Sequence, residues 1–275
     1  MNKSIFYMMI STAGFAVANF FVKYLENIPT SEIVFFRSVI TLVITVSMVV
    51  HLKLPLLGNN HKWLLVRGIA GASSLILFFY TLREIPMASA TTIQYLSPFF
   101  TVVIAIFLLG EKVKPVRWLW FMVAFAGVVF IKGFDDRVSW EWLGLGILSA
   151  FLSAVAYNAI MKCRHTDHPY TVEMAFPLVA APVTGIWAST EWVNPVGQEW
   201  WILLVIGLFT QVAQVFMTKA LHTGKAAVVT PFKYLGVIYA LLLGYFFFEE
   251  TFTLLSLLGM LLVITGVLLN SFTKT

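Results

Sequence analysis

Charged residues are scarce in this sequence. They make up 11% of its 275 residues, whereas 60% are hydrophobic and 16% are aromatic. The mean hydropathy is +0.88. Soluble domains carry about 25% charged residues, so this composition excludes an ordinary soluble protein and predicts a multi-pass membrane protein.

Cysteine is almost absent, because Cys163 is the only one in the chain. An intrachain disulfide is therefore impossible, and a cysteine metal cluster is excluded. Basic residues are spread through short connections without a basic stripe or an aromatic platform, which argues against nucleic-acid binding. We expect no metal and no cofactor.

Catalytic motifs are also missing. The sequence has no H-E-x-x-H, no G-x-S-x-G and no pair of aspartates in the middle of an apolar segment. An intramembrane enzyme needs such a constellation at depth. We therefore expect that the protein is not an enzyme.

Long polar stretches do not occur either. Connections between apolar segments do not exceed roughly a dozen residues, which leaves no room for a soluble domain. Any site must then lie among the helices. The first apolar segment contains Asn19 and Lys23 near its end, and no small-residue cleavage site follows it. We expect this segment to remain in the mature protein.

Long apolar runs dominate what is present. A helix that crosses about 30 Å of hydrocarbon needs about 20 mostly apolar residues. We therefore predict an all-α membrane protein with ten transmembrane helices. The predicted spans cover about residues 5–24, 33–51, 62–83, 87–109, 115–132, 142–162, 171–189, 199–221, 226–248 and 252–272.

Basic residues concentrate in alternate connections between these spans. By the positive-inside rule such connections are cytoplasmic, so we predict that both termini are cytoplasmic and that the protein lies in an inner or plasma membrane. The basic residues of this set are Lys3, Lys53, Lys62, Arg67, Lys112, Lys114, Arg117, Lys162, Arg164, Lys219, Lys225 and Lys274.

The chain contains an internal repeat at a constant offset. Placing Lys233 over Gln94 gives a shift of 233 − 94 = 139. The same shift pairs Tyr95 with Tyr234, Asn19 with Asn158, Lys23 with Lys162 and Glu111 with Glu250. The first copy (residues 1–137) and the second copy (residues 138–275) each hold five predicted spans. Because five is odd, the second copy must be inverted, as in many secondary transporters whose site lies where the halves meet.

Two stretches carry a resemblance to a known family. FYTLREIPMASATTIQYLSPFFTVVIAIFLLGEK (79–112) resembles the signature of the EamA family of the drug/metabolite transporter superfamily, and KALHTGKAAVVTPFKYLGVIYALLLGYFFFEE (219–250) is similar to its second copy. FFRSV (35–39) resembles the arginine that the family often carries early in its second helix. The resemblance implies ten helices around a central cavity and transport of small metabolites, often outward.

Lys233 is the most informative candidate residue. It lies about four residues from the middle of its predicted span, where a charge costs about 2.5 to 3.5 kcal/mol. Such residues normally face the bundle interior or a water-filled cavity. We predict that Lys233 supplies positive charge to a substrate site, opposite Gln94. The alternative is structural pairing with carbonyl groups at a helix end.

Arg37 lies about five residues inside its span, and its guanidinium can clamp a carboxylate or a phosphate. A structural salt bridge with Glu32 or Glu84 is the favoured alternative. Glu173 is likewise expected to pair with Lys219 near the cytoplasmic side.

Several uncharged residues are further candidates. Tyr80, Tyr95, Tyr157 and Tyr234 can form an amphipathic wall for an organic solute, although most tyrosines in a bundle simply pack. The symmetric pair Asn19 and Asn158 can bind a substrate or join helices.

Two prolines are predicted to kink helices next to the cavity, Pro98 in the first copy and Pro231 in the second. The position equivalent to Pro98 is Val237, so the two copies depart from each other here.

The deep charges are both positive, which favours an anionic or zwitterionic substrate over a cationic drug. We predict a secondary transporter, acting as exporter, exchanger or facilitator by alternating access, for a small organic metabolite such as an amino acid or a carboxylate. A broad-specificity drug or metabolite efflux carrier is the alternative, and a channel is less favoured. The expected partners are a small-molecule substrate and the lipid bilayer, and the protein is expected to be a monomer or a homodimer.

Overall fold

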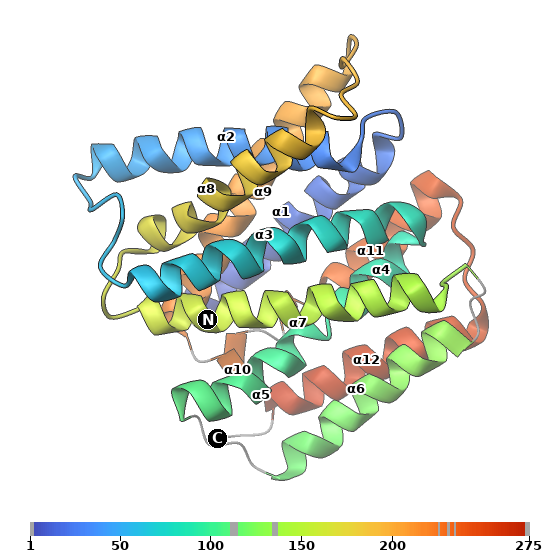
Figure 1. Ribbon diagram of the computed structural model, residues 1–275. Coiled ribbons are helices and arrows are strands. Elements are labelled where there is room, and N and C mark those ends of the chain that lie inside the picture. The colour runs from blue at the N-terminus through green and yellow to red at the C-terminus, as the bar shows by residue number, and fades with distance from the viewer. Residues whose placement is uncertain are drawn as a thin grey trace.

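A computed structural model describes residues 3–110, 115–133, 137–224, 226–229, 232–233 and 235–272. Throughout these residues the regular structure is helical (Figure 1). This agrees with the composition, because a helix satisfies its backbone hydrogen bonds internally where lipid offers no partner.

The helices follow one another with short connections. They are α1 (Lys3–Tyr24), α2 (Thr30–His51), α3 (His61–Glu84), α4 (Met87–Gln94), α5 (Ser97–Leu109), α6 (Pro115–Gly133), α7 (Trp140–Cys163), α8 (Pro169–Ala188), α9 (Glu199–Thr223), α10 (Ala226–Val229), α11 (Leu235–Phe248) and α12 (Leu254–Phe272). Seven segments of the described chain are long and apolar enough to cross a membrane, with Met87–Leu108 counted as one segment. Helix α11 and Leu257–Gly266 are shorter apolar stretches.

The helix bounds repeat along the chain with the shift found in the sequence. Adding 139 to both ends of α6, at 115 and 133, gives 254 and 272, which are the ends of α12. The start of α2 at 30 maps onto the start of α8 at 169, and the end of α3 at 84 maps onto the end of α9 at 223. The two copies therefore have the same helical layout.

Equivalent helices of the two copies run in opposite directions. In Figure 1, α2 runs from right to left, whereas α8 runs from left to right. Helices α3 and α9 are opposed in the same way. In these helices the second copy is thus inverted relative to the first.

The main packing contacts join the two copies to each other. Helix α3 packs against α7, α1 against α9, α2 against α8, and α6 against α12. Two equivalent glycines allow close approach. A Cβ on Gly68 of α3 would lie 2.7 Å from the carbonyl oxygen of Ala175 in α8, and one on Gly207 of α9 would lie 2.6 Å from Ile40 in α2. Small residues let membrane helices pack closely.

Two buried apolar clusters lie toward opposite ends of the bundle. Along α1, Met8 belongs to one cluster and Val22 to the other. Along α7, Ile160 and Ala150 divide in the same way. The stretch between the clusters carries polar side chains on several helices, and this is where the candidate site lies.

Each end of the bundle has a polar contact between the copies. At one end the Glu250 carboxylate accepts from Lys23 Nζ at 2.7 Å and from the backbone nitrogen of Met87 at 2.8 and 3.1 Å. At the other end Asp167 Oδ1 accepts from the backbone nitrogen of Asn59 at 2.5 Å.

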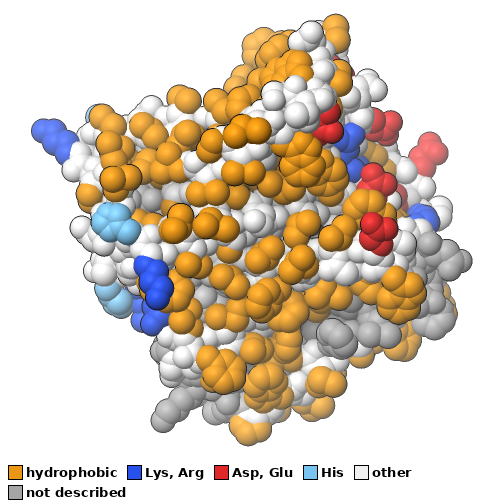
Figure 2. All heavy atoms as spheres, viewed as in Figure 1, with side chains coloured by type: hydrophobic (Ala, Val, Ile, Leu, Met, Phe, Trp, Pro, Cys, Tyr) orange, Lys and Arg blue, Asp and Glu red, His pale blue; other side chains and the backbone are white. Residues whose placement is uncertain are grey.

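Charge is unevenly distributed on the visible surface. Figure 2 shows histidines and most of the basic side chains at the left edge, acidic side chains at the right edge, and a hydrophobic band between them. This pattern is typical of a bundle that crosses a bilayer with its ends in water.

Candidate functional site

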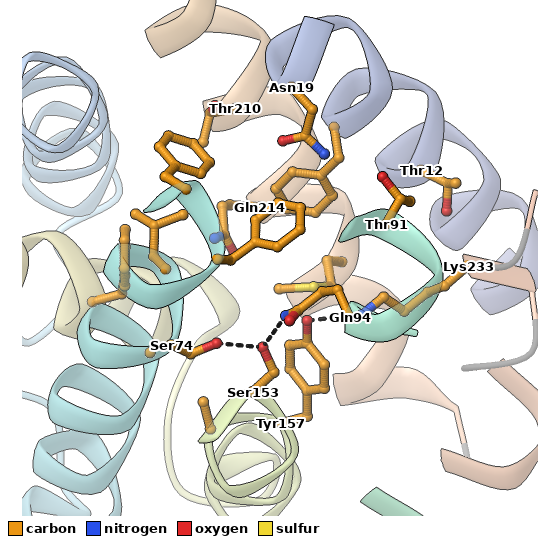
Figure 3. A pocket seen from close by; sticks show the side chains of 18 of the residues that line it. Thr12, Asn19, Ser74, Thr91, Gln94, Ser153, Tyr157, Thr210, Gln214 and Lys233 are labelled. Carbon is orange, nitrogen blue, oxygen red and sulfur yellow. Dashed lines mark hydrogen bonds between the residues drawn. The ribbon is translucent and has the colours of Figure 1, made fainter. Parts of the chain in front are cut away.

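A cavity of about 90 Å³ lies between the two copies. Residues of α1, α2, α3 and α4 line it from the first copy, and residues of α7, α8 and α9 together with Lys233 line it from the second. It has room for water, because about 15 Å³ suffices for one molecule. Figure 3 shows side chains from several helices converging on this space.

Interrupted helices border the cavity. Helix α4 ends at Gln94 and α5 begins at Ser97, while Lys233 lies between α10 and α11. Helix α4 contacts α11, and α5 contacts α10, so the two interrupted segments lie against each other. A single helix over 87–109 was predicted, and the structure divides it.

The interruption does not lie at the predicted proline. Tyr95 and Leu96 separate α4 from α5, and Pro98 follows in the first turn of α5. A proline is tolerated there because the first helical N–H groups have no partner within the helix. Pro98 therefore begins a helix instead of bending one. Pro231 lies outside the described residues.

Lys233 is 6% exposed and lines the cavity. Its Nζ donates to Tyr157 Oη at 2.8 Å and to Ser97 Oγ at 3.4 Å, and it lies 4.3 Å from the centre of the Tyr157 ring. Both acceptors are hydroxyl oxygens. Within the described chain, the one ion pair joins Lys23 to Glu250. The Lys233 ammonium therefore has two hydrogen-bond acceptors, but no described carboxylate forms an ion pair with it.

Gln94 belongs to a network of hydroxyl groups on the same cavity. Its Nε2 donates to Ser153 Oγ at 2.8 Å, and its Oε1 accepts from Ser149 Oγ at 2.9 Å. Ser74 Oγ lies 2.6 Å from Ser153 Oγ. Figure 3 shows this row of side chains beside Tyr157, with Lys233 reaching Tyr157 from the right. Gln94 and Lys233 therefore line one cavity, although neither bonds to the other.

Arg37 is 1% exposed and also lines the cavity. In the described part of the chain, none of its three guanidinium nitrogens has a hydrogen-bond partner. Its Cζ lies 5.4 Å from the centre of the Phe79 ring and 5.3 Å from that of Phe176. The shift of 139 maps 37 onto 176, so the arginine contacts its own repeat equivalent.

The predicted salt bridge of Arg37 with Glu32 or Glu84 is absent among the described residues. Glu32 Oε2 instead accepts from the backbone nitrogen of Val193 at 3.0 Å. Five residues along an α-helix place two side chains about 140° apart. Glu32 and Arg37 therefore leave α2 on different faces.

Arg67, which the charge pattern of the sequence places in a cytoplasmic connection, also lies at the cavity. It is 2% exposed, lines the cavity, and donates from Nη2 to Gln214 Oε1 at 3.3 Å. Its Cζ lies 5.4 Å from the centre of the Phe176 ring. A Cβ on Gly71, one turn later in α3, would collide with Arg67 Nη1. Its position five residues inside the predicted span 62–83 is the sequence signal that could have identified it.

Glu173 was expected to pair with Lys219, and this prediction is wrong. Its Oε2 accepts from Thr45 Oγ1 at 2.6 Å and from Gln211 Nε2 at 3.4 Å. Lys219 Nζ instead donates to Tyr170 Oη at 3.2 Å. Glu173 is 1% exposed and lies on the buried face of α8, whereas Lys219 is only partly buried.

Asn19 and Tyr95 line the central cavity together with Tyr157, whereas Tyr80 and Asn158 do not. Tyr80 stacks on Trp187 with the ring centres 5.6 Å apart, and it lines a second hollow of about 390 Å³ at the Glu250 end. 

Asn158 is fully buried away from the cavity. Its Nδ2 donates to the carbonyl oxygens of Thr101 at 3.0 Å and Ala154 at 2.9 Å, so it joins α7 to α5. Tyr234, the repeat equivalent of Tyr95, lies outside the described residues.

Named relatives of this chain are transporters. The pseudopaline exporter CntI of Pseudomonas aeruginosa is 30% identical over 269 residues, which cover 97% of this chain and 95% of the exporter. Solute carrier family 35 member G1 of Homo sapiens is 26% identical and is covered to 77%, over 95% of this chain. The riboflavin transporter of Rhizobium johnstonii is 26% identical over 88% of this chain and 82% of its own length.

A solved crystal structure shares the fold at 18% sequence identity, with a TM-score of 0.73 over 98% of this chain and 95% of its own. The model of the EamA-like transporter family matches residues 2–133 and again residues 140–272. These two matches coincide with the two copies. The chain therefore belongs to the EamA-like transporter family and is a multi-pass membrane transporter, not an enzyme.

Proposed function

We propose that this protein is a secondary transporter for a small anionic or zwitterionic organic metabolite, and that the cavity between the two copies is its substrate site. One observation carries the proposal: Lys233 and Arg37 present positive charge to the cavity, and no described carboxylate forms an ion pair with either. A buried charge without a counter-ion is costly, and an anionic group of the substrate offsets that cost.

Alternating access is the mechanism that the architecture supports. Inverted copies allow each half to take the conformation of the other, so that the same cavity opens to either side in turn. We propose ten spans, in which α4 with α5, and α10 with α11, each form one interrupted span. Both termini are then cytoplasmic, which agrees with the distribution of basic residues in the sequence.

The relatives support transport but not a particular substrate. Their names include a pseudopaline exporter, a riboflavin transporter and an S-adenosylmethionine uptake transporter. These solutes differ in structure and the named directions differ as well. The substrate class of this chain must therefore be inferred from the residues that line its own cavity.

The proposal is tested by ligand-induced thermal stabilisation of the purified protein, with counterflow in proteoliposomes as the transport readout. The ligands are glutarate, glutamate, glutamine and the cation tetraphenylphosphonium. A ligand at 100 times its Kd stabilises by about 2.7 kcal/mol, so binding is readily seen. We expect anions or zwitterions to stabilise the wild type, and Lys233→Met to fold but to respond more weakly.

Lys219→Met is the matched control, because Lys219 donates to Tyr170 and does not line the cavity. It should keep the wild-type response. Equal stabilisation of the wild type and Lys233→Met by the cation, without any response to anions or zwitterions, would support a drug carrier and contradict the proposal.

A further inference from the structure

The cavity has more positive than negative charge around it. Arg37, Arg67 and Lys233 line it. The nearby buried carboxylate is Glu173, which is bonded to a hydroxyl and an amide and not to any of the three cations. Three cations and one carboxylate leave an excess of 3 − 1 = 2 positive charges in the described part of the site.

These cations fall into two groups carried by different elements. Arg37 of α2 and Arg67 of α3 both lie close to the ring of Phe176 in α8, at 5.3 and 5.4 Å. Lys233 enters from the interrupted segment of the second copy and contacts Tyr157 of α7 and Ser97 of α5. The cavity therefore has an arginine subsite and a lysine subsite.

The arginine subsite is prepared for an anion. In the described chain Arg37 has three nitrogens without a partner, and Arg67 has an unpartnered Nε beside a 3.3 Å bond to Gln214. Because residue 71 is glycine, the Arg67 side chain can lie along α3, where a Cβ at position 71 would collide with it. A guanidinium binds a carboxylate or phosphate through two parallel hydrogen bonds, which matches the free nitrogens.

We propose that the cavity binds a compact organic dianion, with one anionic group at Arg37 and Arg67 and the other at Lys233. This inference rests on the proposed function and narrows it, because a zwitterion would place its ammonium beside an arginine or the lysine. Like charges repel strongly where the dielectric constant is low. The volume of about 90 Å³ favours a short carbon chain between the two groups.

A series of five-carbon ligands separates the charges without changing the shape. Glutarate carries two carboxylates, glutaramate carries one carboxylate and one amide, and glutaramide carries two amides. We expect wild-type protein to bind glutarate about 10- to 100-fold more tightly than glutaramate, because each charge-assisted contact is worth that factor. Glutaramide should bind most weakly. Affinities come from the ligand dependence of the melting temperature.

Variants then assign the two subsites. In Lys233→Met and in Arg37→Met, the ratio of glutarate to glutaramate affinity should fall to near unity, since one anion site remains. Gly71→Ala should lower the ratio as well by displacing Arg67 while keeping its charge. Two control variants should keep the wild-type ratio. One is Lys219→Met, and the other is Gly144→Ala, because an added Cβ at Gly144 has nothing within 4 Å.

The outcomes distinguish this inference from the proposed function. If wild type binds glutaramate or glutamine as tightly as glutarate, the dianion inference is overturned, and this comparison needs no variant. If the ratio persists in both folded variants, the assignment of the subsites fails. The proposed function still stands in either case when any anion or zwitterion shows saturable counterflow. It falls as well if none binds and none exchanges.

Discussion

At the residue scale, Arg37 combines a buried charge with the absence of any described hydrogen-bond partner. Its contacts are the faces of Phe79 and Phe176. A cation over an aromatic face gains about 0.5 to 2 kcal/mol, which is less than the several kcal/mol that burial of an ion costs. Arg37 is therefore a source of instability in the empty protein.

Replacing this arginine should stabilise the protein. We expect Arg37→Met to raise the free energy of unfolding of the ligand-free protein by about 1 to 4 kcal/mol. Replacing buried charges by well-packed apolar residues often makes a protein more stable. The same variant should be stabilised less by glutarate than the wild type is. Both effects are read from melting curves in detergent with and without glutarate.

Arg83→Met provides the contrast. Its guanidinium donates to the carbonyl oxygens of Ile28 at 2.7 Å and Glu26 at 2.6 Å, so its loss should destabilise. A destabilisation of the same size in Arg37→Met would mean that Arg37 also has a structural role.

The sequence identified much of the cavity lining from depth and from the repeat. Lys233, Gln94, Tyr95 and Asn19 are polar at intramembrane positions, and the structure places all four on the cavity. Arg67 was missed, because it lies near the beginning of its predicted span and was counted as a connection charge.

Which face a polar residue presents decides the remaining cases. Asn158 and Tyr80 are intramembrane and polar, yet Asn158 bonds to backbone carbonyls and Tyr80 faces a different hollow. Depth alone cannot reveal the direction of a side chain.

At the element scale, most predicted spans agree with the helices of the structure to within a few residues. The predicted spans 142–162 and 199–221 correspond to α7 (Trp140–Cys163) and α9 (Glu199–Thr223). Hydrophobic runs bounded by polar connections suffice for such helices.

The break between α4 and α5 was not predictable in the same way. Tyr95 and Leu96 occupy it, and neither residue is a helix breaker. Tertiary packing against the other interrupted segment accompanies the break, and local propensity gives no sign of such packing.

The close crossing of α3 and α8 can be tested by adding a methyl group to a glycine between them. We expect Gly68→Ala to destabilise the protein by about 1 to 3 kcal/mol, because the added methyl group would meet the backbone oxygen of Ala175 at 2.7 Å and force α3 from α8. Gly207→Ala should have a smaller effect, since the side chain of Ile40 can move. Unfolding midpoints measure both.

Gly144→Ala controls for the change in helix propensity. It lies in α7 with open space around it and should be neutral or stabilising by up to about 1 kcal/mol. Equal effects at Gly68 and Gly144 would show that the crossing of α3 and α8 can relax without loss.

At the scale of the whole molecule, the backbone is symmetric while the cavity lining is not. The serine network of Ser74 and Ser153 maps by the shift of 139 onto Ala213 and Gly14. Under the proposed alternating access, the two conformations would share a layout, yet the substrate would meet the same serines in both.

The contact of Lys23 with Glu250 closes one end of the bundle, so its removal tests how the cavity opens at that end. We expect Glu250→Gln to open this end of the bundle, because it removes the ion pair and weakens the bond to Met87. A cysteine at Thr91, which lines the cavity, should then react about tenfold faster with a membrane-impermeant maleimide, equivalent to about 1.4 kcal/mol. Cys163→Ser provides the background for labelling.

The repeat supplies the opposite perturbation. Glu111 is equivalent to Glu250 by the shift of 139, and Lys162 is equivalent to Lys23. Glu111→Gln should therefore slow labelling from the same side, whereas the neighbouring Glu249→Gln should leave it unchanged. Identical labelling rates in all three variants would contradict a proposed exchange between two gates that are related by the repeat.

The contact between Arg37 and its repeat equivalent Phe176 has a consequence for the ancestry of such molecules. Two identical five-helix subunits related by a two-fold axis present the same residue twice at that axis. Two arginines facing each other there would repel, and two phenylalanines would offer no charge. Fusion of both halves into one polypeptide removes this restriction, so a single gene can combine a cation and an aromatic ring in the cavity between the halves.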